Sequence, residues 1–183
     1  MDLWKWGESM KKFTLGFISI FLLCFMLTGC TETTSTDEQG NEKKEFNISE
    51  TATVNKTKIK INSVKRVDSE CMSEYENECL AKTEPENDYF LVFDLTIENT
   101  DKEELSVSSI MSFNLKDTNG EQGKYTFLSE NVTSQLDGSI MANDLLKGQI
   151  AYDVKDSDKF YFYYTDSLLD DQIKFVINKS DIQ

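Results

Sequence analysis

The sequence predicts an all-β protein, an antiparallel β-sandwich of about seven or eight short strands that follows a signal peptide and a disordered linker. Three observations predict this class. Beyond residue 50, apolar residues recur mainly at every second position, which is the period of a strand with one buried face. Turn sequences rich in Asp, Asn and Gly separate these segments. No long stretch after the signal has the 3.6-residue period of an amphipathic helix.

The clearest strand covers residues 89–98. One face carries only apolar side chains, namely Leu91, Phe93, Leu95 and Ile97. The other face carries Asp94, Thr96 and Glu98, and Val92 is its one apolar exception. This contrast fixes which face turns toward the core, because a shift of one residue would exchange the two faces.

Further strands follow from the same alternation. Their apolar positions are Met111, Phe113 and Leu115; Ile150, Tyr152 and Val154; and Ile173, Phe175 and Ile177. The segment 57–67 begins in phase but shifts at Asn62-Ser63, as a β-bulge requires. A shorter strand is predicted over 124–128, and turns are predicted at 99–101, 117–120, 137–138 and 156–158. These elements together favour an immunoglobulin-like topology.

The amino-terminal segment has the order of a lipoprotein signal. Lys11 and Lys12 precede an apolar run over 13–26, which is shorter than the roughly 20 residues of a membrane-spanning helix. Leu-Thr-Gly-Cys at 27–30 closes the run and resembles the lipobox of bacterial lipoproteins, which implies cleavage before Cys30 and a lipid on its sulfur. The alternatives are an ordinary secretory signal or an uncleaved anchor. Translation can start at Met1 or Met10.

Three parts are therefore expected along the chain: a signal peptide over 1–29, the lipidated Cys30 with a flexible linker over 30–49, and the sandwich over 50–183. From Thr31 to about Glu45 the chain has no apolar residue, so it cannot offset the entropy of ordering. Phe46 and Ile48 are expected to mark the end of this linker. Several acyl chains anchor a protein stably, so we expect the domain on the extracytoplasmic side of the cell membrane.

The charge balance excludes several functions. The chain has 19 Lys and Arg against 33 Asp and Glu, a formal net charge of −14, which repels nucleic-acid phosphates. It has no histidine, and no Gly-rich phosphate loop or HExxH helix is present, so we expect no enzyme, no cofactor and no metal site. A calcium-binding surface is the open alternative, because oxygen ligands suffice for calcium. Its candidates, which lack EF-hand spacing, are Asp156, Asp158, Asp166, Asp170 and Asp171.

Two cysteines remain once Cys24 leaves with the signal and Cys30 carries the lipid. An even remainder outside the cytoplasm favours a structural disulfide between Cys71 and Cys79. Closing this short loop would stabilise the fold by about 2.5 kcal/mol in the chain-entropy account. Two free thiols or redox chemistry are the alternatives. Redox chemistry is disfavoured because Glu74, Glu76 and Glu78 in the loop oppose formation of a thiolate.

An aromatic run covers residues 160–164. Alternation places Phe160, Phe162 and Tyr164 on one face of a strand and Tyr161 with Tyr163 on the other. One interpretation is a central strand whose second face is covered by a loop or the linker. The other is an exposed surface of Tyr161 and Tyr163 that binds a protein, peptide or glycan.

The order of lipobox, acidic linker and strand motifs resembles the domain-of-unknown-function 4352 group of Gram-positive lipoproteins. The motifs are Lys-Ile-Lys-Ile at 58–61, the strand sequence at 89–99, and Leu-Lys-Gly-Gln-Ile-Ala-Tyr-Asp-Val at 146–154, whose Gly148 is taken as part of a turn. The resemblance implies an immunoglobulin-like fold, similar to a secreted mycobacterial antigen. It implies no catalytic residue.

The function expected from these features is that of a membrane-anchored binding or interaction module. The partners are the membrane, through the lipid on Cys30, and an unidentified protein or small ligand. The alternative is an accessory subunit that stabilises a membrane complex.

Overall fold

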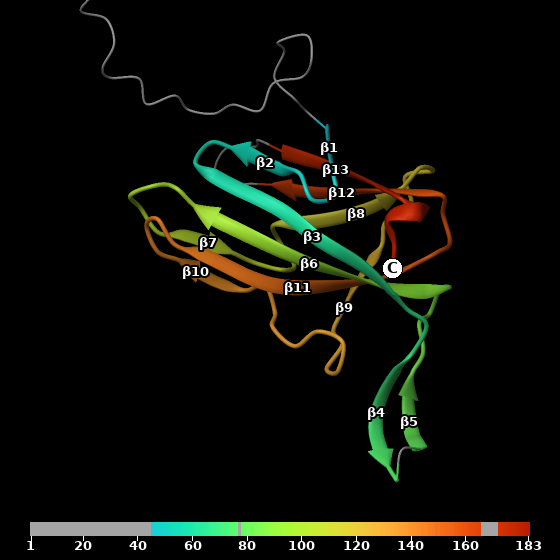
Figure 1. Ribbon diagram of the computed structural model, residues 1–183. Coiled ribbons are helices and arrows are strands. Elements are labelled where there is room, and N and C mark those ends of the chain that lie inside the picture. Colours follow the sequence, from blue (N-terminus) through green and yellow to red (C-terminus); the bar gives the residue numbers. More distant parts are fainter. Residues whose placement is uncertain (1–44, 77, 166–171) are drawn as a thin grey trace, which may run out of the picture. The chain divides into compact units, whose positions relative to one another are not determined.

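The computed structural model describes residues 45–76, 78–165 and 172–183. The predicted signal peptide, Cys30 and residues 31–44 of the linker lie outside the described residues. The described part contains thirteen strands and one short 3₁₀ helix, η1 (Lys179–Asp181) (Figure 1). Within it, no helix has the length and hydrophobicity needed to cross a bilayer.

Five strands form one antiparallel layer. In spatial order they are β2 (Thr51–Val54), β3 (Thr57–Val67), β6 (Tyr89–Asn99), β11 (Leu145–Val154) and β9 (Lys124–Thr126). The ladder between β3 and β6 shifts its register between Ile61 and Ser63, so the predicted β-bulge is confirmed. The strand predicted over 124–128 is confirmed but shorter, because Leu128 leaves the ladder and packs beneath the sheet.

Four strands form the second layer. In spatial order they are β1 (Glu45–Asn47), β13 (Gln172–Asn178), β12 (Lys159–Thr165) and β8 (Phe113–Asp117). β1 runs parallel to β13, and the other pairs are antiparallel. Two small ribbons complete the described part: β7 (Leu105–Val107) with β10 (Gly138–Ile140), and β4 (Glu70–Tyr75) with β5 (Glu78–Thr83).

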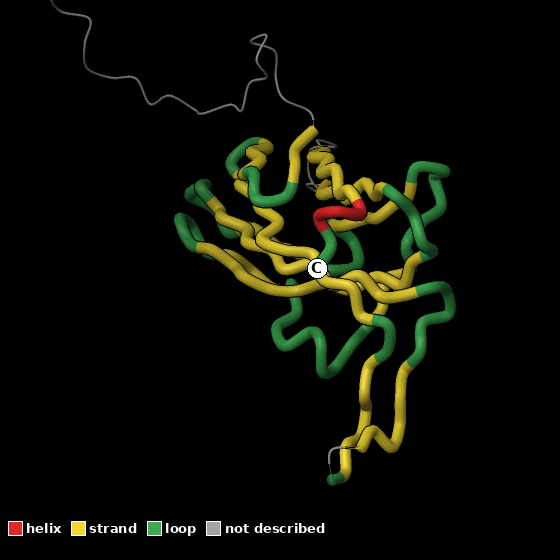
Figure 2. The backbone as a smooth tube through the Cα atoms, turned by 45° about the vertical axis from the view of Figure 1, so that its right-hand side comes forward, coloured by secondary structure: helices red, strands yellow, loops and turns green. Residues whose placement is uncertain are grey.

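The two large sheets face each other across an apolar core (Figures 1 and 2). Phe93 of β6 stacks on Phe162 of β12, with 4.6 Å between the ring centroids, and so joins the two layers. The inward positions predicted for three strands are all buried: Leu91, Phe93, Leu95 and Ile97; Ile150, Tyr152 and Val154; and Ile173, Phe175 and Ile177. The predicted β-sandwich is therefore confirmed.

The five-stranded sheet is buried on part of its outer face as well. A second apolar cluster forms there from Val67, Phe90, Val92, Leu128, Val132 and Ala151. Leu128 and Val132 belong to the loop 127–137, which crosses this face. The loop explains why Val92 was the apolar exception on the outer side of its strand. It also buries Ala151, which the alternation had placed on the solvent side.

Two further local predictions are wrong. Met111 is 80 % exposed rather than inward-facing, because a turn closed by the Ser112 N–H on the Ser108 carbonyl (2.9 Å) delays β8 until Phe113. Gly148 lies inside β11, where a Cβ would come within 3.0 Å of the Gln135 carbonyl oxygen. Glycine therefore permits the close approach of the loop 127–137, and it is not a turn residue.

The number and limits of the strands also differ from expectation. The sequence predicted about seven or eight. Among the additional strands, β1, β2, β7 and β10 have three or four residues, too short to show a periodic pattern, whereas β4 and β5 form a ribbon in the stretch that was expected to be a loop. β1 lies in the stretch assigned to the linker, where Phe46 is only 3 % exposed and packs on Phe175 with 5.8 Å between ring centroids. The four-stranded sheet thus includes residues 45–47, which the sequence analysis assigned to the linker.

Two buried tyrosines differ in how their hydroxyl groups are satisfied. Tyr152 packs edge-on against Phe93 and Phe162, and its hydroxyl has no hydrogen-bond partner within the described residues. The Tyr89 hydroxyl donates to Asp156 Oδ1 at 3.1 Å. Burial and this hydrogen bond raise the pKa of Tyr89 to about 12, and burial raises the pKa of Tyr152.

Replacing Tyr152 by Phe is expected to raise the free energy of unfolding by about 1 kcal/mol, because an unpaired buried hydroxyl carries a desolvation penalty. Urea denaturation at neutral pH measures the change. Tyr89→Phe is the matched control and is expected to lower stability by about 1 kcal/mol, since it removes a hydrogen bond to a carboxylate. A destabilised Tyr152→Phe variant would show that its hydroxyl is hydrogen-bonded in solution.

Candidate functional site

The structure places Tyr161 and Tyr163 on the outer face of the four-stranded sheet. Both are half-buried, whereas their neighbours Phe160, Phe162 and Tyr164 point into the core. The alternation predicted along β12 is therefore confirmed. A binding role for the two tyrosines stays a prediction.

Two lysines lie over these tyrosine rings. Lys174 Nζ of β13 is 4.2 Å from the ring centroid of Tyr161, and Lys116 Nζ of β8 is 5.8 Å from that of Tyr163. Lys174 also forms a 2.6 Å ion pair with Glu45 of β1, and this hydrogen bond raises the pKa of Lys174. The surface thus combines aromatic rings with cationic groups in a chain that is acidic as a whole. Because Glu45 neutralises Lys174, Lys116 is the lysine of this surface without an ion pair within the described residues.

The cysteine pair lies on a projecting hairpin. Cys71 of β4 and Cys79 of β5 form the predicted disulfide, with 5.7 Å between their Cα atoms. β4 and β5 pair only with each other within the described residues, and the ribbon points away from the two large sheets (Figure 1). We call β4 and β5 together the arm. The disulfide crosses the arm, and neither cysteine belongs to the apolar clusters of the sandwich, so it stabilises the arm rather than the core.

Two buried carboxylates hold the chain at the root of the arm. Glu70 Oε1 accepts hydrogen bonds from the backbone N–H groups of Glu130 and Asn131, and so ties the start of β4 to the loop 127–137. Asp153 of β11 accepts from the backbone N–H groups of Glu86 (2.6 Å) and Asn87 (3.1 Å), just after β5. Both acids are almost fully buried.

The alternation of apolar residues does not identify these two acids. It puts Asp153 on the face opposite Tyr152 and Val154, which is the expected solvent face, and Glu70 is one of several glutamates in its segment. The one sequence signal that could have pointed to them is the unusual length of the segment 68–88, which connects the paired strands β3 and β6.

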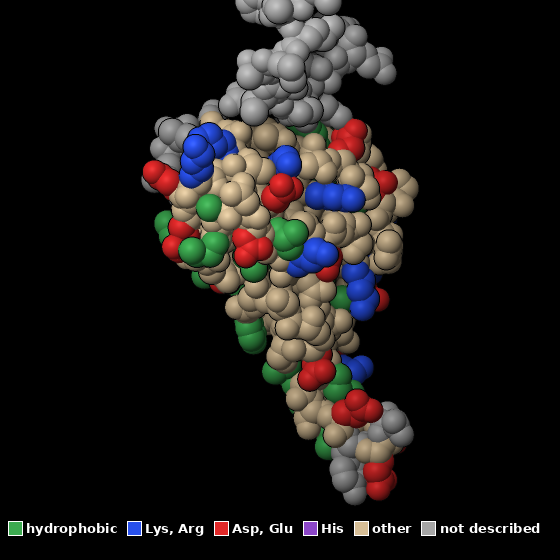
Figure 3. Space-filling view, turned by 60° about the vertical axis from the view of Figure 1, so that its left-hand side comes forward, with side chains coloured by type: hydrophobic (Ala, Val, Ile, Leu, Met, Phe, Trp, Pro, Cys, Tyr) green, Lys and Arg blue, Asp and Glu red, His purple; other side chains and the backbone are tan. Residues whose placement is uncertain are grey.

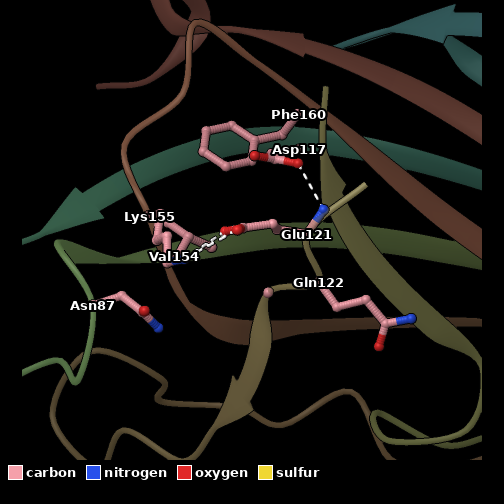
Figure 4. A pocket seen from close by; sticks show the side chains of 8 residues that line it. Asn87, Asp117, Glu121, Gln122, Val154, Lys155 and Phe160 are labelled. Atoms are coloured by element: carbon pink, nitrogen blue, oxygen red, sulfur yellow. Dashed lines mark hydrogen bonds and ion pairs between the residues drawn. The ribbon is translucent and has the colours of Figure 1, made fainter. Parts of the chain in front are cut away.

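A cavity of about 290 Å³ opens between the end of β8, the residues after it and the end of β11 (Figure 4). Asn87, Asp117, Glu121 and Lys155 supply its polar groups, and Val154 and Phe160 supply apolar ones. The Lys155–Glu121 ion pair (2.8 Å) spans it, as Figure 4 shows. Because these two charges neutralise each other, the carboxylate of Asp117 is the charge that remains among the residues that line the cavity.

Asp117 is the most constrained acid of this cavity. Its Oδ1 accepts from the backbone N–H groups of Asn119 and Glu121, both at 2.8 Å, and its Oδ2 accepts from Asn119 Nδ2 at 3.1 Å. Burial alone would raise the pKa of Asp117, but these hydrogen bonds hold it below the ordinary value. The carboxylate therefore closes the turn 117–120, in which Gly120 has a φ of +84°.

The calcium candidates do not come together in the described part. Asp156 is held by Lys179 Nζ at 2.7 Å and by the Tyr89 hydroxyl, and these contacts lower the pKa of Asp156. Asp166, Asp170 and Asp171 lie outside the described residues. Within the described ranges, no group of three or more potential ligands could hold a metal ion.

Comparisons with known proteins identify a family and a fold. The family model described as Domain of unknown function (DUF4352) matches residues 46–175. No curated protein matches the sequence.

Three solved structures are similar to this chain, and the first two of them illustrate its fold. The yjhA protein from Bacillus subtilis is 17 % identical, with a TM-score of 0.55 over 73 % of this chain and 99 % of its own. A candidate lipoprotein from the same species, ycdA, is 18 % identical, with a TM-score of 0.57 over 72 % of this chain but only 39 % of its own. A β-sandwich protein from Clostridium difficile is 18 % identical, with a TM-score of 0.47 over 75 % of this chain and 97 % of its own. At such identities the likeness shows the fold alone.

The hydrogen bonds of Asp117 predict a pH-dependent contribution to stability. A lowered pKa means that the group stabilises the fold above the ordinary Asp pKa of about 3.9 and loses this contribution as the pH falls through the native pKa. The stability difference between the natural protein and Asp117→Asn is therefore expected to be largest near pH 7 and to shrink below about pH 4.

Urea denaturation at neutral and acidic pH measures this difference. Asp158→Asn is the matched control, because Asp158 is exposed and is expected to show little difference at either pH. An Asp117→Asn effect of the same size at both pH values would contradict the prediction.

Proposed function

Because the chain belongs to the DUF4352 family, a family of unknown function, we propose a role from its own residues: a lipid-anchored extracytoplasmic domain that binds a partner. The observation that carries the anchor is the order of Lys11 and Lys12, the apolar run, Cys30 and a polar linker. The domain that follows begins with β1 at the edge of the four-stranded sheet. A Bacillus protein of similar fold is itself described as a candidate lipoprotein, which supports the proposal.

The binding part of the proposal rests on surface chemistry. Tyr161 and Tyr163 keep part of their rings accessible on a sheet that carries Lys116 and Lys174. Tyrosine offers a large contact area at a small entropy cost. The described residues hold no metal cluster, and the family and the similar structures supply no activity. An interaction role therefore agrees with the available chemistry better than catalysis.

The alternative of an accessory subunit differs in the kind of partner. A binding module captures a protein or ligand of the cell exterior, whereas an accessory subunit travels with an integral membrane protein. Crosslinking of the anchored protein on living cells, followed by mass spectrometry, distinguishes the two by the partner that is recovered.

Cys30→Ala is expected to abolish incorporation of a labelled fatty-acid analogue and to release the lipid anchor, because no other side chain at the end of the apolar run can carry a thioether-linked lipid. Metabolic labelling and membrane fractionation measure the two effects. Cys24→Ala is the matched control, since it removes a thiol from the same apolar segment. Labelling that survives in Cys30→Ala but is lost in Cys24→Ala would overturn the anchor proposal.

The double variant Tyr161→Ala and Tyr163→Ala is expected to reduce crosslinking to the partner by tenfold or more while the domain stays folded, because both rings lie outside the core. Crosslinking yield on cells and the melting temperature measure the two effects. Phe127→Ala is the control, because it removes an exposed aromatic ring from the loop 127–137. Loss of the folded state in the double variant would assign the tyrosines a structural role instead.

A further inference from the structure

The connection between β3 and β6 is much longer than the sandwich needs. Val67 of β3 lies opposite Phe90 of β6 in one antiparallel ladder. Antiparallel neighbours are commonly joined by about two to five residues, yet residues 68–88 intervene here. The additional chain forms the arm, which leaves the sandwich as a two-stranded ribbon (Figures 1 and 2). A connection of this length points to a role other than joining two strands.

Several contacts hold the arm in one direction. An isolated two-stranded hairpin is only marginally stable in water. Here the Cys71–Cys79 disulfide crosses the two strands. Glu70 fixes the first strand to the loop 127–137, and Asp153 fixes the chain that follows the second. The arm is therefore preorganised, which lowers the entropy cost of binding a partner.

The surface of the arm offers both apolar side chains and free backbone groups. Met72 is 51 % exposed and Leu80 is 66 % exposed, although each is a large apolar residue. β4 and β5 pair only with each other, so each has one edge without a neighbouring strand in the described part. Such edges present N–H and C=O groups at the spacing of a further strand, and this is the geometry that peptide recognition by strand addition uses.

The negative charge of the arm favours a partner strand that is positively charged. Residues 70–86 contain six glutamates and one lysine. Glu74, Glu76 and Glu78 are exposed and form no ion pair within the described residues. Acidic side chains lie along the lower end of the arm in the space-filling view (Figure 3). Like charges oppose pairing with the arm of a second copy, whereas they favour a strand that carries Lys or Arg.

We propose that the arm docks an extended, cationic segment of a partner protein by strand addition to β4 or β5. The partner segment carries Lys or Arg, which meet the glutamates, together with apolar residues, which meet Met72 and Leu80 at the irregular positions of the ribbon. The inference deepens the proposed interaction role. It depends neither on the lipid on Cys30 nor on Tyr161 and Tyr163. The docking proposal therefore still stands if the proposals for the lipid anchor or for the tyrosines prove wrong.

The test uses the full chain in detergent and two fluorescent peptides of seven residues with the same charge. One alternates Lys with Val, and the other alternates Lys with Pro, which has no N–H to donate. Fluorescence anisotropy is expected to show at least tenfold tighter binding of the Lys-Val peptide. Hydrogen exchange is expected to show new protection of amides in β4 or β5 and none in the sandwich edges β2 and β9.

Matched variants separate the arm from general electrostatics. Replacing Glu74, Glu76 and Glu78 by Gln is expected to weaken binding of the Lys-Val peptide at least tenfold. Neutralising Glu103, Glu104 and Asp158, which are also exposed, is expected to have a much smaller effect on this binding. Met72→Ser with Leu80→Ser is likewise expected to weaken it, and Met141→Ser with Leu145→Ser is the control pair of exposed apolar residues. Cys71→Ser with Cys79→Ser is expected to weaken it by loosening the arm.

Three results would overturn the proposal. Equal binding of the Lys-Val and Lys-Pro peptides would show that charge alone drives association. Equal losses in the arm variants and in their controls would place the site elsewhere. Dimers of the full chain with protected arm amides would make a second copy the occupant.

Discussion

The stacking of Phe93 on Phe162 is the contact on which the rest of the structure depends. It joins the central strand of the five-stranded sheet to β12 of the other sheet, and Phe113 and Tyr152 pack around it. Full burial of one such side chain stabilises a fold by roughly 1.5–3 kcal/mol. Because β12 is fixed at this point, its alternate residues Tyr161 and Tyr163 are held on the outer face. The position of the candidate tyrosine surface is thus a consequence of core packing.

The outer face of the five-stranded sheet is covered by a loop, and the backbone of that loop must be hydrogen-bonded. The loop 127–137 buries a small apolar cluster there, and its polar backbone groups need partners in place of water. Glu70 accepts from two of its N–H groups, while Asp153 serves the segment after β5 in the same way. Each carboxylate accepts from backbone N–H groups rather than pairing with a lysine or arginine, but Glu70 Oε2 is buried without a hydrogen-bond partner within the described residues. Glu70 therefore connects the covering loop to the arm.

The surfaces of this domain carry contrasting chemistry. The four-stranded sheet presents tyrosines under lysines, although the chain as a whole is strongly acidic, and the arm presents glutamates beside Met72 and Leu80. A sandwich scaffold is common to many unrelated functions, so membership of the family and likeness of fold leave the activity open. What distinguishes this chain is the arm, because the connection between β3 and β6 exceeds what their pairing requires.

The sequence by itself determined the sandwich, the inward faces of its long strands, the bulge at Asn62-Ser63 and the Cys71–Cys79 pair. These features are local: a period of two fixes which side chains share a face, and two cysteines in a short loop have few other partners. Only the tertiary structure decided that Met111 is exposed, that Gly148 lies within a strand and that Glu70 and Asp153 are buried. The last three depend on segments distant in sequence, such as the loop 127–137 against Gly148 and Glu70. Met111 is exposed by the turn between Ser108 and Ser112, which the alternation of apolar residues does not show. A pattern within one strand predicts that a face is apolar, but it does not predict which segment covers that face. The covering segment is distant in sequence, and only folding brings the two parts of the chain into contact.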